Sequence, residues 1–315
     1  MVSPFSLFLK AALCHKSIFC DPKQDLALSH YFPYNRIVFS FSILFPKERK
    51  VYPMALFQIQ NLRSNEVHRK VSVNVLLPVD SHAQHPAGER FRTLYLFHGV
   101  TDNNMAWLLN TRLYELTEKY NLCVVLPSGE NSFYMNREDR FECWENFFCQ
   151  ELPLLMQRSF PLSARREDTF IGGFSMGGFG ALRNGLKHHE QYGKIFCFAP
   201  ALELEYTMDS TYDADNYLMN RSFIEAHYGP DLPSCRNSDK DPLWLIDHLT
   251  AQGIELPKIY MATGQDDTLA DVHRTIEQHL KAAKADYTAN IVPGVHDWDF
   301  INCNLDQALQ WLAEK

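Results

Sequence analysis

The sequence lacks the features that mark several large classes of protein. It has no block of lysine or arginine and a formal net charge of −8, which argues against a nucleic-acid surface. No apolar run approaches the roughly 20 residues that a membrane span needs. The eight cysteines form no CxxC pair and no metal-ligand spacing, which indicates reduced, mostly buried thiols in a cytoplasmic protein. We therefore expect a globular protein without a nucleic-acid, membrane or metal partner.

Residues 1–53 differ in character from the rest of the chain. Their opening, MVSPFSLFLKAALCHKSIFC, lacks the basic start and the small-residue cleavage site that are typical of a signal peptide. The segment KERK (47–50) would be encoded by a purine-rich run of codons, as a bacterial ribosome-binding site is. We interpret residues 1–53 as a non-native or disordered extension and Met54 as the natural start.

From Met54 onward, short apolar segments alternate with amphipathic ones. Strands are predicted over 71–78, 92–99, 121–129, 168–175, 194–201, 257–264 and 287–294, and helices over 106–120, 144–160, 238–249, 272–285 and 305–315, with one more from Gly177. This alternation predicts one α/β domain over 54–315, with a mostly parallel central sheet and helices on both faces. Residues 202–256, rich in Tyr, Asp and Met, interrupt it and predict a cap-like insertion over one end of the sheet.

Gly173-Phe174-Ser175-Met176-Gly177 fits G-x-S-x-G, the nucleophile elbow, and has the required strand before it and helix after it. The glycines leave room for a sharp turn that lifts the Ser175 hydroxyl above the edge of the sheet. The alternative is a glycine-rich turn between strand and helix that has no catalytic role. A phosphate-binding loop is disfavoured, because the segment has no G-K-[ST] ending.

An acid and a histidine follow the serine in the order that such a fold requires. Asp266 and Asp267 come just after the strand over 257–264, and His296 comes after the next strand. The residues leave open which aspartate is the acid. In the chemistry that this set predicts, His296 takes the proton of Ser175 as the hydroxyl attacks an acyl carbon, and the aspartate orients the imidazole.

The negative charge that develops in such a reaction needs backbone donors. We expect one in the Met176 N–H, directly after the serine, and the other in the Val100 N–H, in the loop after the strand over 92–99. His98 is expected to shape this loop and to carry no protons. Trp107, Tyr206 and Trp244 either line an apolar substrate pocket or pack the chain around it.

Four segments together resemble the esterase D family of α/β hydrolases, which includes S-formylglutathione hydrolases and bacterial tributyrin or acetyl esterases: LYLFHGVTDNNMAWL, GFSMGGFGAL, TGQDDTLAD and GVHDWDF. The resemblance runs from about Met54 to Lys315. It implies the α/β-hydrolase fold and a cytoplasmic serine esterase for small acyl groups, often homo-oligomeric and without a cofactor. It also implies Ser175 as nucleophile, His296 as base and Asp267 as acid.

The leading hypothesis is a serine carboxylesterase for short-chain acetyl or butyryl esters. S-Formylglutathione hydrolysis is one alternative, but Phe174 stands where those enzymes tend to have histidine, and Arg63, Arg137 and Arg140 are the only candidates to bind the anionic glutathione. A second alternative is an acetyl or feruloyl esterase for plant-derived sugar esters. A non-catalytic binding scaffold is disfavoured, because all three catalytic candidates are present.

Overall fold

The computed structural model describes residues 54–78, 90–201, 204 and 207–314, and these belong to one compact unit. The expectation for residues 1–53 lies outside the described residues. Among the described residues, no helix combines the length and the apolar character that crossing a membrane requires.

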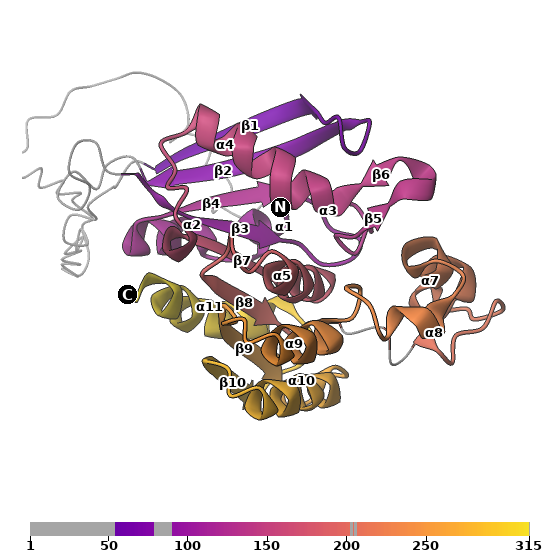
Figure 1. Cartoon of the computed structure of the whole chain (residues 1–315). Coiled ribbons are helices and arrows are strands. Elements are labelled where there is room, and N and C mark those ends of the chain that lie inside the picture. Colours follow the sequence, from indigo (N-terminus) through magenta and orange to yellow (C-terminus); the bar gives the residue numbers. More distant parts are fainter. Residues whose placement is uncertain (1–53, 79–89, 202–203, 205–206, 315) are drawn as a thin grey trace, which may run out of the picture. The chain divides into compact units, whose positions relative to one another are not determined.

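Eight strands form one twisted sheet in the order β1-β2-β4-β3-β7-β8-β9-β10 (Figure 1). They are β1 (Met54–Arg63), β2 (Lys70–Pro78), β3 (Arg92–Phe97), β4 (Leu122–Pro127), β7 (Thr169–Phe174), β8 (Lys194–Phe198), β9 (Lys258–Gly264) and β10 (Tyr287–Val292). From β4 to β10 all neighbours are parallel, whereas β2 pairs antiparallel with both β1 and β4. The predicted mostly parallel sheet is therefore confirmed.

The helices are α1 (Ala106–Asn110), α2 (Leu113–Tyr120), α3 (Trp144–Asn146), α4 (Leu152–Ser159), α5 (Met176–Lys187), α7 (Arg221–Tyr228), α8 (Leu232–Cys235), α9 (Pro242–Ala251), α10 (Ala270–Ala282) and α11 (Trp298–Ala313). A short hairpin, β5 (Asn136–Arg137) and β6 (Glu142–Cys143), lies between β4 and α3. Side chains of α1, α2 and α11 pack on one face of the sheet, and those of α4, α5 and α10 pack on the other.

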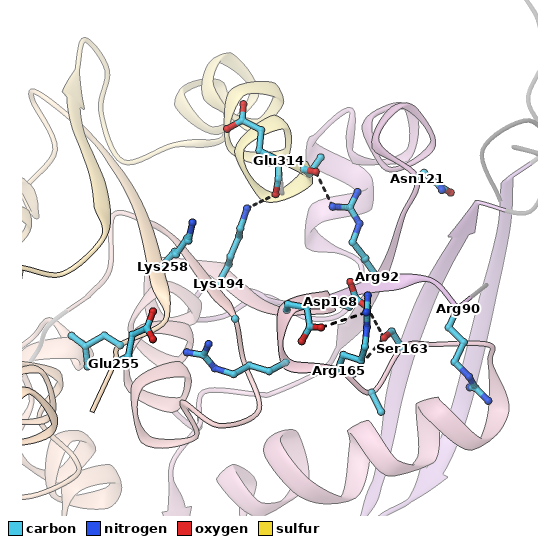
Figure 2. A pocket seen from close by; sticks show the side chains of 16 residues that line it. Arg90, Arg92, Asn121, Ser163, Arg165, Asp168, Lys194, Glu255, Lys258 and Glu314 are labelled. Carbon is cyan, nitrogen blue, oxygen red and sulfur yellow. Dashed lines mark hydrogen bonds and ion pairs between the residues drawn. The ribbon is translucent and has the colours of Figure 1, made fainter. Parts of the chain in front are cut away.

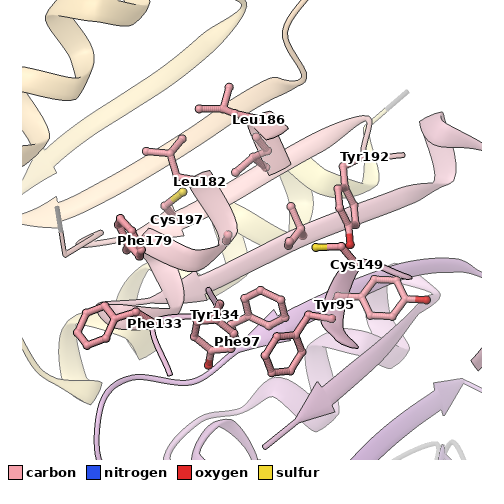
Figure 3. Packing of buried hydrophobic residues seen from close by; sticks show 14 of the residues in the cluster. Tyr95, Phe97, Phe133, Tyr134, Cys149, Phe179, Leu182, Leu186, Tyr192 and Cys197 are labelled. Atoms are coloured by element: carbon pink, nitrogen blue, oxygen red, sulfur yellow. The ribbon is translucent and has the colours of Figure 1, made fainter. Parts of the chain in front are cut away.

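The larger core cluster lies between the sheet and α5. Figure 3 shows part of it, in which the Phe97 ring stacks on Tyr134 with centroids 4.2 Å apart. Phe179, in the first turn of α5, packs edge-to-face on Phe133. All six residues of β7 are buried, so this strand is held on both sides and fixes the point where α5 begins.

Several helix boundaries differ from those predicted, and each difference has a local cause. The helix expected over 106–120 is split at Thr111, whose extended backbone (φ −136°, ψ 170°) ends α1 and whose hydroxyl accepts from the Leu113 N–H. The last helix begins at Trp298, since the Asp297 side chain caps it by accepting from the Phe300 N–H. Pro153 restarts the helix expected over 144–160, because it lies in the first turn of α4 after a π-helical turn.

The insertion between β8 and β9 carries α7 and α8, which Figure 1 shows beyond the carboxyl ends of the strands. The helix expected over 238–249 is α9, capped by the Asp241 side chain. It packs against α5 and α10, so it belongs to the helix layer of the sheet and not to a cap. The cap-like part therefore ends before α9.

Candidate active site

Ser175 occupies the sharp turn between β7 and α5. Its backbone has φ +57° and ψ −119°, in the strained region that non-glycine residues rarely adopt. A Cβ at Gly173 would lie 2.3 Å from the Gly177 carbonyl oxygen, and a Cβ at Gly177 would lie 2.5 Å from the Phe97 oxygen. The turn can therefore close only with glycine at both positions, which is the physical content of the G-x-S-x-G pattern.

The structure brings Ser175, His296 and Asp267 into one hydrogen-bonded chain. His296 Nε2 lies 3.0 Å from Ser175 Oγ, and His296 Nδ1 lies 2.8 Å from Asp267 Oδ2. The side chain of Asp267 is fully buried, and its Oδ1 accepts from the Leu269 N–H at 2.8 Å. Asp266 is exposed, so of the two candidate aspartates Asp267 is the one that contacts the imidazole. A carboxylate on Nδ1 fixes the proton there and leaves Nε2 free to accept from the serine hydroxyl.

Aromatic rings hold the imidazole in place from one side. The Phe174 ring lies over His296 with centroids 4.6 Å apart, and Trp298 packs against Phe174 at 5.4 Å. Phe174 thus comes from the elbow itself and restricts how far the imidazole can turn away from Ser175.

His98 holds the loop after β3 in shape, as expected. It is 1% exposed, and its Nε2 accepts from the Gly129 N–H at 2.8 Å. Because that nitrogen accepts, Nδ1 carries the proton and donates to the Gly99 carbonyl at 2.7 Å. Burial lowers the pKa of His98 to about 4, so the imidazole is neutral at physiological pH. Both ring nitrogens are engaged, and neither is available for proton transfer.

Residues 128–135, after β4, brace the same loop at two more points that the sequence did not indicate. The Tyr134 hydroxyl donates to the His98 carbonyl at 2.9 Å, and the Thr101 N–H donates to Asn131 Oδ1 at 2.7 Å. Thr101 and Tyr134 both have positive φ, of 65° and 56°. Strain of this kind persists only where surrounding contacts hold it. No sequence motif marks these residues.

The two expected backbone donors belong to residues near Ser175, Val100 in the loop after β3 and Met176 at the start of α5. Gly99 passes so close that a Cβ there would lie 3.7 Å from the Ser175 Cβ, which puts Val100 next to the nucleophile. Met176 is the first residue of α5, where N–H groups have no partner within the helix. The Val100 N–H donates no hydrogen bond to another described residue.

Comparison with known proteins places the chain in a family. Residues 64–312 match the family model described as "Putative esterase". The acetyl esterase of Caldicellulosiruptor saccharolyticus is 37% identical over 265 residues, which cover 83% of this chain and 99% of that protein. The chain belongs to the esterase family. The predicted resemblance to the esterase D family is confirmed.

Solved structures show the fold of this esterase independently. A fluorophosphonate-binding serine hydrolase of Staphylococcus aureus superposes with a TM-score of 0.74 at 23% identity, covering 84% of the esterase and all of that chain. The S-formylglutathione hydrolase of the same organism superposes with a TM-score of 0.72 at 23% identity, covering 83% and 100%. A ferulic acid esterase superposes with a TM-score of 0.67 at 19% identity, covering 83% of this chain and 98% of that one. The predicted α/β-hydrolase fold is confirmed.

The three residues named for a substrate pocket have different positions in the esterase. Trp107 is 1% exposed, and its Nε1–H donates to the Phe97 carbonyl at 3.0 Å, so it is a core residue beneath the site and not a pocket wall. Trp244 stacks on His248 within α9. Among the described residues, no hydrogen bond or ring contact links Trp244 to Ser175. Tyr206 lies outside the described residues.

A cavity of about 1020 Å³ lies at the end of the strands opposite to Ser175, near the amino-terminal ends of β8 and β9 (Figure 2). Lys194 projects into it and donates to the Glu314 and Trp311 carbonyls, at 2.7 and 2.9 Å. Arg92 donates to the Ala313 carbonyl at 2.8 Å. Burial, together with the nearby Lys258, lowers the Lys194 pKa to about 8. These cations cap the carboxyl end of α11, which is a structural role.

In the part of the esterase that the structure describes, no cluster of His, Cys, Asp and Glu residues has the arrangement of a metal site.

Proposed function

We propose that this carboxylesterase hydrolyses short-chain esters of the acetyl and butyryl type through an acyl-enzyme formed on Ser175. The observation that carries the proposal is the hydrogen-bonded chain from Ser175 through His296 to the buried Asp267, at 3.0 and 2.8 Å. Such a chain makes a serine hydroxyl nucleophilic at neutral pH.

In the first half of the reaction Ser175 Oγ attacks the acyl carbon while His296 Nε2 takes the hydroxyl proton. A tetrahedral intermediate forms, and its oxyanion accepts hydrogen bonds from the Val100 and Met176 N–H groups. Such preformed donors contribute about 3–4 kcal/mol each to transition-state stabilisation. The carbon–oxygen bond to the leaving group then breaks, and His296 returns the proton to the departing alcohol.

In the second half a water molecule takes the place of the alcohol. His296 removes one proton from the water, whose oxygen attacks the acyl carbon of the ester on Ser175. The intermediate collapses to release the carboxylic acid, and the proton returns to Ser175 Oγ. Asp267 stays ionised throughout and stabilises the imidazolium that forms twice in each cycle.

The short acyl group is inferred from the acetyl esterase of Caldicellulosiruptor saccharolyticus, which is 37% identical to this chain over 99% of the length of that esterase. A cytoplasmic location is part of the proposal as well. It is supported by four buried and unpaired cysteines, Cys123, Cys149, Cys197 and Cys235, which suit a reducing compartment.

The test uses the purified full chain with p-nitrophenyl esters of increasing acyl length. We expect the highest kcat/KM for acetate or butyrate, and a loss of about 10³-fold or more in Ser175→Ala. Ser159→Ala, an exposed serine of α4, is the matched control and should leave the activity unchanged. Full activity in Ser175→Ala, or failure of a fluorophosphonate probe to label Ser175, would contradict the proposal.

A further inference from the structure

The His296 imidazole must keep its orientation through the whole reaction cycle, although its side chain is 33% exposed. Its hydrogen bonds to Asp267 and Ser175 fix the two ring nitrogens. They leave the ring free to turn about the line that joins those nitrogens. Among the described residues, Phe174 is the only aromatic side chain that packs on this ring. The orientation of the base therefore depends on where the Phe174 ring lies.

Phe174 contacts two parts of the site at once. Its ring lies 4.6 Å from the His296 ring, centroid to centroid, with an angle of 32° between the ring planes. A Cβ at Gly99 would lie 3.9 Å from Phe174 Cδ1, so the same ring also borders the loop that carries Val100. Because one ring contacts both, its position helps to set the distance between the base and the Val100 N–H.

Two tryptophans connect Phe174 to the core. Trp298, the first residue of α11, packs on Phe174 with centroids 5.4 Å apart, and Trp107 of α1 meets Trp298 edge-on at 5.3 Å. Trp107 is itself fixed, because it is 1% exposed and its Nε1–H donates to the Phe97 carbonyl at 3.0 Å. Each of these separations lies in the favourable range for aromatic pairs, about 4.5–7 Å. The rings thus form a continuous stack from the end of β3 to the base.

We propose that Trp298 is a positioning residue of this esterase, which acts through Phe174 to hold the His296 imidazole in line with Ser175. The inference rests on the proposed function, because it takes His296 as the base of the reaction. Trp298 follows His296 by two residues, so one short segment supplies both the base and a ring that supports it. The competing explanation is that Trp298 only anchors the first turn of α11 to the core, which would affect stability and not turnover.

The test compares Trp298→Leu with Trp311→Leu, which removes a second partly buried tryptophan near the other end of the same helix. Hydrolysis of p-nitrophenyl acetate gives kcat and KM. The rate constant of fluorophosphonate labelling reports how fast Ser175 attacks in the folded molecules, whatever their fraction. We expect Trp298→Leu to lower kcat and this rate constant by about two- to tenfold, the value of one aromatic pair, with KM nearly unchanged. Trp298→Phe should keep most of both, and Trp311→Leu all of both.

A double-mutant cycle tests the route through Phe174. In a Phe174→Leu background, Trp298→Leu should have little further effect on kcat, because the ring through which it acts is already absent. The proposal is overturned if the two losses multiply in full, or if Trp298→Leu lowers only the amplitude of labelling and not its rate constant. An equal loss in Trp311→Leu would overturn it too. In each of these cases an active parent enzyme leaves the proposed function standing, whereas a parent inert toward the ester would refute that function itself.

Discussion

The Tyr134 hydroxyl offers a direct test of how the loop after β3, which carries Val100, is held. It donates to the His98 carbonyl at 2.9 Å, while its ring stacks on Phe97 and packs against Phe148. Tyr134→Phe keeps both ring contacts and removes only the donor. The substitution therefore separates the hydrogen bond from the packing around it.

The size of the effect follows from the strength of one buried hydrogen bond, about 0.5–1.5 kcal/mol. If the bond holds the loop fully in the transition state, kcat falls by about two- to tenfold, since about 1.4 kcal/mol corresponds to a factor of ten. Removing an oxyanion donor itself costs about 10²–10³-fold, which sets an upper limit. KM should change little, because the ground-state carbonyl gains less from these donors than the oxyanion does.

The assay is steady-state hydrolysis of p-nitrophenyl acetate, with active enzyme titrated by a fluorophosphonate. Tyr192→Phe is the matched control, because it removes a hydroxyl from an equally buried tyrosine at the other end of α5. The reasoning is refuted if Tyr134→Phe leaves kcat at the parent value, or if Tyr192→Phe lowers it as much.

Three further outcomes are expected. Asp267→Asn should lower kcat by about 10⁴-fold, because the imidazole then takes the wrong tautomer. The circular dichroism spectrum and the Tm should stay close to those of the parent. A loss of kcat under about tenfold would contradict the assignment of Asp267 as the acid. Glu145→Gln should lower the free energy of urea unfolding by about 3 kcal/mol, because it breaks a buried ion pair and leaves the buried Arg183 with only the partly exposed Asp239 as a carboxylate partner; kcat per folded molecule should not change. A loss below about 1 kcal/mol, roughly that of a surface pair, would contradict this. Burial lowers the pKa values of His98 and His273 to about 4 from the ordinary 6.5. Between those pH values the unfolded chain binds more protons, so the Tm should fall as pH drops from about 6.5 to 4. The fall should be smaller in His273→Leu, and an equal fall in both proteins would exclude His273 as a cause.

Where a local pattern is strong, the sequence was sufficient to predict the structure. β7 is apolar after Thr169, and the G-x-S-x-G pattern is formed by close neighbours along the chain, so Ser175 could be assigned its turn. The order of acid and histidine after it limited the partners to Asp266 or Asp267 and His296. The choice between the two aspartates depends on which of them is buried, and it required the coordinates.

Features that arise from long-range contacts could not be predicted. β1 was missed because it is an edge strand whose Leu56 and Phe57 are 40% and 41% exposed, so its alternation is blurred. Trp107 was a pocket candidate because it follows the loop after β3, but its indole turns into the core toward Phe97. The brace from Tyr134 depends on a hydroxyl meeting a carbonyl 36 residues away along the chain, and no spacing rule describes that contact.

The glycine-lined turn at Ser175 has a consequence for how this enzyme can diversify. Main-chain atoms of β3 and α5 fill all the space around Gly173 and Gly177, so any larger residue at either position disrupts the turn before it meets a substrate. Changes in substrate preference must therefore arise outside this turn. A mutant library that keeps residues 173–177 fixed separates the search for new substrates from the preservation of the chemistry.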